Sequence, residues 1–557
     1  VADIRLPASV LGLIPARLHV LNQEEQELLD VAACCGFEVD PLLVAAAMGT
    51  PEIAALKLFG RVERHHGLLV TNGRRYVFDH HQIQEAIYGG MPPLLRERYH
   101  EKLAEALEAR GEASGEDARV ELCTHWLHSP HPARALAYLD RALERLAATY
   151  RNAALCRIAE RALGHQALLT GPDRVGVLLR LRRALDMLGR RGEERRILDE
   201  ALALAREGAE GELLARVLAE DGGHLERTGH RERAVSRLQE AVRLARQADA
   251  PATEANVSRV LGTTLVYLGR YDEARRESQT ALRLYQQLGD PWGEAAATAN
   301  LGLVQLFSGY SASALSCFER ELEFFKEAAD PRSEAIARAN LGFLLSDLGR
   351  HAAGRKRLDA ALEIVRRLGD RFLEAFLLDW LAQVSYRSGE PAAARDLVGR
   401  SLAIRRSILD RARVAESLVT LGLVEAAAGN RPEALRALEE SIRLAEATRS
   451  GAVLCRATAH RSALHGDVTP ALGALAAHER ALRYAARIEV RHALWKATGD
   501  PAHLHEARRR LEHLRAHAPG AMRRTLVEYV PLHRDIVAAG ERLDTAEEAP
   551  EPAPPSP

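Results

Sequence analysis

The stretch Ala299-Asn-Leu-Gly-Leu-Val-Gln-Leu-Phe-Ser-Gly309 recurs forty residues later as Ala339-Asn-Leu-Gly-Phe-Leu-Leu-Ser-Asp-Leu-Gly349. Its closing glycine belongs to a series with the same interval: Gly189, Gly229, Gly269, Gly309, Gly349, Gly389 and Gly429. A constant period of this length is typical of stacked helical hairpins that form a solenoid. Because such stacks present long binding surfaces and rarely carry catalytic pockets, the period predicts a binding protein and not an enzyme.

Other positions recur in the same register, and each has a mechanical reason. Glycine costs a helix interior about 1 kcal/mol relative to alanine, so its recurrence there indicates close approach of a second helix. These interior glycines are Gly262, Gly302, Gly342 and Gly422. Two units begin with Asp290-Pro291 and Asp330-Pro331, where aspartate caps free N–H groups and proline fits the first turn. Between these points apolar residues lie three and four positions apart, which is the helical period.

This pattern resembles the tetratricopeptide repeat in its 40-residue form. The resemblance implies an all-α fold in which about eight hairpins over residues 113–455 build a right-handed superhelix. The glycines of the main series are expected to end the first helix of each hairpin in a left-handed conformation. Residues 456–540 are expected to form closing helices, among them 505–515 and 523–539. The Pro- and Glu-rich stretch 541–557 is expected to be disordered.

Composition excludes several classes of protein. The formal net charge of the 557 residues is -1, so no overall field favours nucleic acid or an anionic membrane. Aromatic residues make up only 5% of the chain, which favours a core of closely packed Ala and Leu. The six cysteines form no CxxC pair, and no apolar run is long enough to span a membrane. These features predict a cytoplasmic protein, and the excess of Arg over Lys is typical of GC-rich bacteria.

Residues 1–112 do not repeat and are predicted to form a small winged-helix domain. Helical patterns cover about 7–21, 24–35, 40–48 and 51–64. Two short extended stretches follow, 67–70 and 75–78, and Asn72-Gly73 between them is a strong hairpin signal.

Three segments resemble bacterial STAND-class signalling ATPases. Leu6–Leu18 with Leu21–Leu29 resembles the segment that follows their ATPase core. Phe78-Asp-His80 followed by Glu85-Ala-Ile-Tyr88 is similar to a motif of that family, and Val530-Pro-Leu-His-Arg534 resembles its closing element. The resemblance implies an upstream nucleotide-switched ATPase. This sequence has no GxxxxGK[ST] phosphate loop, so no cofactor is expected for it.

Histidines supply the remaining candidate sites. The resemblance implies that His80 senses the phosphates of a nucleotide held by the upstream ATPase; the alternative is a histidine that caps or packs locally. A second group is close in sequence and has metal-ligating side chains: Cys123, His125, His128 and His131. Pro130 and Pro132 interrupt the helix there, and the spacing is not that of a closed zinc site, so no metal is expected.

The resemblance places the first helix of each hairpin on the concave face. The predicted partner-binding groove consists of Thr263, Val266, Leu303, Leu306, Phe343, Ser346, Gln383, Tyr386 and Leu423. This mostly apolar stripe favours a protein or peptide segment as the partner. The alternative is that these residues pack against one another inside a tight superhelix and leave no open groove.

These patterns together predict a protein-binding scaffold or sensor module of a bacterial signalling ATPase. Two alternatives remain open: a transcription regulator that contacts DNA through the winged helix, and the non-catalytic tail of a protein kinase or nucleotide cyclase. DNA contact is not favoured, because the helical pattern over 51–64 has balanced charge and is largely apolar.

Overall fold

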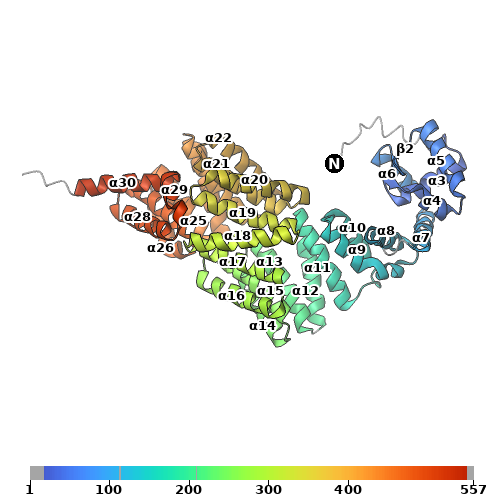
Figure 1. The fold of residues 1–557 in the computed structure, drawn as a ribbon, viewed down its shortest axis with the longest axis horizontal. Helices are drawn as coiled ribbons and strands as arrows, with labels where there is room; N and C mark the ends of the chain where they lie inside the picture. The colour runs from blue at the N-terminus through green and yellow to red at the C-terminus, as the bar shows by residue number, and fades with distance from the viewer. Residues whose placement is uncertain (1–17, 112–114, 209, 548–557) are drawn as a thin grey trace, which may run out of the picture. The chain divides into compact units, whose positions relative to one another are not determined.

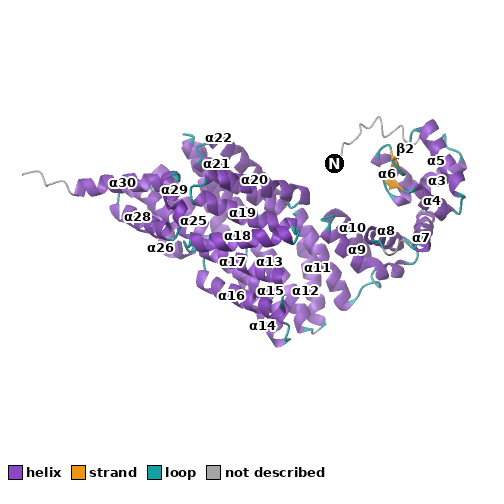
Figure 2. Cartoon of the chain, in the orientation of Figure 1, coloured by secondary structure: helices purple, strands orange, loops and turns teal. Residues whose placement is uncertain are grey.

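The computed structural model describes residues 18–111, 115–208 and 210–547. Most of the predicted helix over 7–21, and the tail from residue 548 onward, lie outside these residues. The chain forms two compact units, residues 1–184 and 185–557, and the predicted boundary at residue 112 falls inside the first. Helices account for nearly all of the regular structure, as Figure 2 shows.

The first unit begins with helices and a small sheet. Its elements are α3 (Gln23–Cys35), β1 (Glu38–Val39), α4 (Pro41–Met48), α5 (Glu52–His66), β2 (Leu69–Asn72), β3 (Arg75–Phe78), α6 (His81–Gly90), α7 (Pro93–Ala109), α8 (Glu116–His128), η2 (Pro132–Ala135), α9 (Leu136–Ala148), α10 (Asn152–Gly164) and most of α11 (Gly171–Leu188). The sheet has the order β1-β3-β2 with antiparallel neighbours. Leu28, Phe59 and Phe78 form part of the core beneath it.

The predicted hairpin is present, but its connection is shorter than expected. The stretches predicted at 67–70 and 75–78 are separated by residues 71–74, whereas Asn72 pairs with Arg75, so the loop is only Gly73-Arg74. Gly73 has a φ of +62° and occupies the first loop position, where a type II′ turn requires a residue with positive φ. Asn72 is therefore the last residue of β2.

The second unit is built from helical hairpins followed by shorter helices. Its helices are α12 (Arg191–Glu207), α13 (Gly211–Arg227), α14 (Arg231–Gln247), α15 (Pro251–Tyr267), α16 (Tyr271–Leu288), α17 (Pro291–Phe307), α18 (Ser311–Glu327), α19 (Pro331–Asp347), α20 (His351–Leu368), α21 (Arg371–Arg387), α22 (Pro391–Ser407), α23 (Arg411–Ala427), α24 (Arg431–Ala447), α25 (Gly451–His465), α26 (Thr469–His478), η3 (Glu479–Ala481), α27 (Tyr484–Thr498), α28 (Pro501–Ala516), η4 (Gly520–Met522), α29 (Arg523–Glu528) and α30 (Pro531–Glu547). Figure 1 shows α13 to α22 stacked as successive hairpins.

Local sequence signals explain these hairpins. Every glycine of the 40-residue series lies in the turn after a first helix and has a φ between 73° and 91°. Asp290 and Asp330 accept hydrogen bonds from the backbone N–H of Gly293 and Ser333 and so cap α17 and α19. The interior glycines also allow close contact: a Cβ on Gly422 would lie 2.7 Å from Leu438 of the partner helix. The predicted hairpin signals are confirmed.

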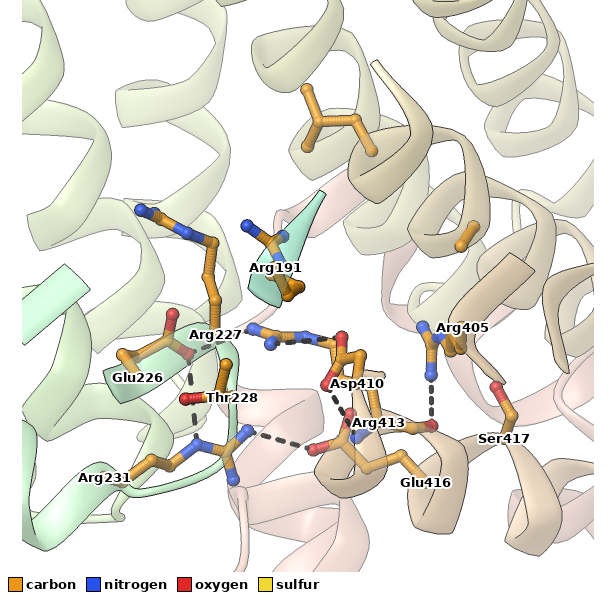
Figure 3. A network of polar contacts seen from close by, with 12 residues as sticks. Arg191, Glu226, Arg227, Thr228, Arg231, Arg405, Asp410, Arg413, Glu416 and Ser417 are labelled. Carbon is orange, nitrogen blue, oxygen red and sulfur yellow. Dashed lines mark hydrogen bonds and ion pairs between the residues drawn. The ribbon is translucent and has the colours of Figure 1, made fainter. Parts of the chain in front are cut away.

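Hairpins far apart in the chain also meet. Arg231 at the start of α14 pairs with Glu416 of α23 at 3.3 Å, although the two residues are 185 positions apart. Arg413 of α23 pairs with Glu226 of α13 at 3.1 Å, as Figure 3 shows. Burial by itself raises the pKa of Glu226, but Arg413 and Arg231 outweigh it and hold this pKa below its usual value. A buried ionic network therefore closes one superhelical turn of the second unit.

The C-terminal helices continue this closure. Thr525 of α29 donates a hydrogen bond to the carbonyl of Leu348 at 2.8 Å, and His351 bonds the carbonyl of Tyr529 at 2.9 Å. α30 extends to Glu547, so residues 541–547 are helical and not disordered as expected; Leu543 packs against the core there. The closing helices predicted over 505–515 and 523–539 correspond to α28, α29 and α30.

Within the described part of the chain, no single helix has both the length and the apolar composition of a membrane span. The adjoining α4 and α5 reach these values only together, and a bend of 119° separates them.

Candidate functional site

The nine residues of the predicted groove all lie on first helices of hairpins, on α15, α17, α19, α21 or α23. Four of them are buried: Val266, Leu306, Phe343 and Ser346. The other five are half-buried: Thr263, Leu303, Gln383, Tyr386 and Leu423. Leu306 and Phe343 belong to the same apolar core as Ile488 and Leu511, so the C-terminal helices pack directly on this face.

The face is nevertheless not completely filled. Gln383, Tyr386 and Leu423 face a cavity of about 640 Å³. Its opposite wall comes from the C-terminal helices and includes Leu526, His533 and the rest of the Val530–Arg534 segment. We name this space the C-terminal cavity. It lies between the repeats and the closing helices, so anything bound in it touches both.

Paired charges line one side of the C-terminal cavity. The carboxylate of Asp347 forms ion pairs with Arg387 at 2.6 Å and with Arg483 at 2.9 Å. These ion pairs join the C-terminal ends of α19 and α21 to the residue before α27. Burial alone would raise the pKa of Asp347, but the two guanidinium groups outweigh it and lower this pKa. The carboxylate is therefore ionised at neutral pH, and the trio connects two hairpins to the closing helices.

A second trio lies on another side of the same cavity. Glu489 of α27 accepts from Arg456 at 3.0 Å and from His460 at 2.7 Å, both on α25. Although burial raises the pKa of Glu489, Arg456 and His460 lower it well below its usual value. The charges of these two trios are thus already balanced within the walls, and the exposed lining residue Lys496 pairs with Asp535 at 3.8 Å.

Two further cavities lie against the first helices of the hairpins. Val266, Leu303, Phe343 and Gln383 face a middle cavity of about 140 Å³, which shares Gln383, Arg456 and Arg483 with the C-terminal cavity. Thr263 and Leu303 face a third cavity of about 350 Å³. Because five aromatic rings line it, we name it the aromatic cavity; they are Tyr267, Trp292, Phe325, Phe372 and Phe376.

His80 lies apart from these cavities, in the first unit. It is exposed and directly precedes α6, and its side chain makes no capping hydrogen bond. The neighbouring His81 stacks on Phe37 with ring centroids 3.8 Å apart. An exposed imidazole is accessible to a ligand, and nucleotide sensing by His80 stays a prediction.

The histidines near residue 125 have a structural environment. His100 Nδ1 and His125 Nδ1 are 2.9 Å apart, and the ring of His128 stacks on His100 at 4.9 Å. Burial, reinforced by neighbouring histidines, lowers the pKa of His100 to about 2 and that of His125 to about 3. His131 instead pairs with Glu101 at 3.3 Å. Within residues 18–111, 115–208 and 210–547, no group of three or more His, Cys, Asp or Glu side chains is arranged to hold a metal ion.

Family comparison agrees with the repeat pattern. The tetratricopeptide repeat model matches residues 253–327, 333–407 and 374–447. These units are tetratricopeptide repeats. A model for anaphase-promoting complex subunit 5 also matches residues 224–254, and no curated protein sequence matches the chain.

Several solved structures are similar to this chain. A Rap protein complexed with competence and sporulation factor shares 13% identity with it, over 67% of this chain and 99% of that one, with a TM-score of 0.46. The STAND protein with a tetratricopeptide repeat sensor from Pyrococcus horikoshii shares 15%, over 86% of this chain and 66% of that one, with a TM-score of 0.37. The Cut9–Hcn1 heterotetramer shares 15%, over 73% and 80%, with a TM-score of 0.40. At identities this low, none of these likenesses bears on function.

The residues that sequence reasoning missed are mostly charged. Asp347 and Arg387 each follow a groove residue by one position, and Arg483 and Glu489 come from outside the repeats. Their pairing depends on how the closing helices dock, which the repeat register does not encode. Glu321 did carry a local signal, since it replaces the Ala or Ser found at this position of neighbouring units.

Proposed function

We propose that this chain is the partner-binding sensor portion of a bacterial STAND-class signalling ATPase, and that a protein segment binds in its C-terminal cavity. The observation that carries the proposal is the composition of the cavity walls. One wall is the inward stripe of the repeats, and the other is the closing helices with the Val530–Arg534 segment.

The chemistry of the lining fits a peptide. Leu423 and Leu526 supply apolar contacts, Gln383 supplies an amide, and the trio around Asp347 supplies polar edges. A peptide presents apolar side chains together with backbone N–H and C=O groups. Its binding site therefore needs apolar contacts as well as hydrogen-bond partners. A volume of about 640 Å³ accommodates a short segment of a few residues and not a folded domain.

Binding between two walls gives a route to signalling. A segment that touches both the repeats and the closing helices stabilises whichever arrangement brings them to the right separation. Arg483 and Glu489 join the two walls through ion pairs with Asp347 and Arg456, so a shift of one wall is transmitted to the other. Occupancy would thereby change the population of one arrangement.

The first unit supports the wider context. Its helices, together with a three-stranded sheet ending in a hairpin, support the proposal that this part is a winged helix. Helix α5 carries exposed Ile53 and Leu56, and an apolar face suits a protein neighbour better than the phosphates of DNA. The motif resemblances at 78–88 and 530–534 support an upstream ATPase as that neighbour.

The binding proposal is tested with a phage-displayed library of random dodecapeptides selected on the full chain. Leu423→Trp places a bulky indole ring in the C-terminal cavity, and Arg443→Trp places the same ring on an exposed position of α24 as a matched control. We expect enriched peptides that bind the wild-type chain and the control but lose affinity for Leu423→Trp. Enrichment of no peptide, or equal binding by all three proteins with native circular dichroism, would refute the site.

The signalling context is tested separately by the coding sequence upstream of Val1. An open frame that encodes a phosphate-binding loop supports the proposal. A stop codon directly before Val1 contradicts it.

A further inference from the structure

A single glutamate interrupts a series of small buried residues on the second helices. The series is Ala281, Ala361, Ser401 and Ser441, each with no exposed surface. Glu321 occupies the equivalent position of α18 and is 3% exposed. A carboxyl group buried where neighbouring units carry a methyl or hydroxyl group is costly unless something pairs with it.

The structure shows little that pairs with this carboxyl. The Asn340 side chain hydrogen-bonds it, but no described residue bonds Glu321 Oε2. Burial consequently raises the pKa of Glu321 to about 8. The group lines the aromatic cavity, which has a volume of about 350 Å³.

Aromatic rings lie beside this carboxyl. Phe325 is one helical turn after Glu321 and on the same face of α18. Trp292 meets Phe325 edge to face with ring centroids 5.8 Å apart, and Trp292 is 42% exposed. The cavity therefore reaches the surface at the first turn of α17. An acid beside aromatic faces is a suitable environment for an ammonium group.

Four arginines also line the aromatic cavity, and three of them have acidic partners. Arg227 pairs with Asp186 at 3.2 Å, Arg332 with Asp370 at 3.0 Å, and Arg413 with Glu226 at 3.1 Å.

The fourth arginine, Arg259, differs. It donates to Asn256 at 3.0 Å and hydrogen-bonds Tyr285, and its Nε is buried without a hydrogen-bond partner. No ion pair to Arg259 or Glu321 exists among the described residues. The cavity thus contains one guanidinium and one carboxyl that lack ionic partners, together with an apolar aromatic lining.

We propose that the aromatic cavity binds a small zwitterion, namely a free amino acid with an apolar or aromatic side chain. Its ammonium pairs with Glu321, its carboxylate pairs with Arg259, and its side chain contacts Phe325, Phe372 and Phe376. An anion alone leaves Glu321 unpaired, and a cation alone meets the guanidinium of Arg259. The site shares no lining residue with the C-terminal cavity, so it does not depend on the proposed partner segment.

The experiment is calorimetric titration of the full chain with each of the twenty proteinogenic amino acids, at pH 7 and pH 8. For a binder such as L-phenylalanine we expect two analogues to fail, N-acetyl-L-phenylalanine, which lacks the ammonium, and L-phenylalaninamide, which lacks the carboxylate. Ionisation of Glu321 on binding releases close to one proton at pH 7, seen as a heat that depends on the buffer. Affinity should rise several-fold from pH 7 to pH 8.

Variants test the named residues. Glu321→Gln keeps the shape of the side chain and should remove the proton release and weaken binding about tenfold or more. Glu323→Gln on the exposed face of α18 is the matched control and should bind as the wild type does. Binding of no amino acid, unchanged binding by Glu321→Gln, or equal binding of the N-acetyl analogue would each overturn the proposal. The two analogues probe the wild-type chain, so the test does not rely on a variant folding.

Discussion

Replacing Glu321 by Gln should make the second unit more stable at alkaline pH, and the gain can be calculated. The pKa of Glu321 is about 8 in the folded chain and 4.5 in the unfolded chain. Because the pKa of Glu321 is higher in the folded chain than in the unfolded chain, its contribution to the free energy of unfolding is most favourable below pH 4.5. This contribution is lost as the pH rises through 8. At 1.36 kcal/mol per pKa unit, the loss between pH 5 and pH 8 is about 3.5 kcal/mol, or about 400-fold in the opening equilibrium.

Hydrogen exchange is the appropriate assay, because a chain of stacked hairpins does not unfold in a single two-state transition. The opening free energy of peptides covering α17 to α19 is measured at pH 5 and pH 8, after correction for intrinsic exchange rates. The wild-type chain should lose about 3.5 kcal/mol more than Glu321→Gln over this range. The exposed Glu323→Gln should follow the wild type.

The difference between the opening free energies at pH 5 and pH 8 contains only the contributions of groups that titrate in this range. Any change in packing caused by the amide is the same at both pH values and cancels. If the wild type and Glu321→Gln lose protection equally from pH 5 to pH 8, Glu321 titrates in the ordinary range. The reasoning that burial without a partner raises its pKa would then be wrong.

Three other predictions follow from contacts elsewhere. Arg413→Met leaves Glu226 buried without its main cation and should cost about 3–5 kcal/mol, seen as a lower melting temperature, whereas adding Glu226→Gln should restore part of it. Gly422→Ala forces a Cβ to within 2.7 Å of Leu438 and should cost about 1–3 kcal/mol in the opening free energy of α23 and α24, measured by hydrogen exchange; an unchanged opening free energy would mean that the helices separate freely. Because the pKa of His100 is lowered to about 2, the first unit should lose stability as pH falls below 6.5, by about 2 kcal/mol at pH 5. Circular dichroism at pH 7 and pH 5 checks this, and His100→Gln should show a smaller loss.

Much of the repeat geometry could be predicted from short-range patterns. Asp290 caps α17, and Gly302 brings α17 and α18 into contact, because these effects act between residues within one hairpin. The groove stripe could be assigned to first helices for the same reason. The predictions failed at the hairpin connection, where β2 continues to Asn72 because this residue pairs with Arg75, and at Leu543, where a helix continues because tertiary contacts hold it.

The sequence by itself determined that hairpins form, where the repeat hairpins turn, and which helices are the first of each pair, since each depends on side chains a few positions apart. Only the tertiary structure decided what fills the inside. The small rotation between neighbouring hairpins accumulates until Arg413 reaches Glu226, 187 positions away, and until Ile488 of α27 joins the same apolar core as Phe343. This accumulated rotation cannot be read from any local sequence pattern. The cavity around Gln383 lies between the repeats and the closing helices, and the cavity around Glu321 lies between repeat helices as far apart in the chain as α13 and α23.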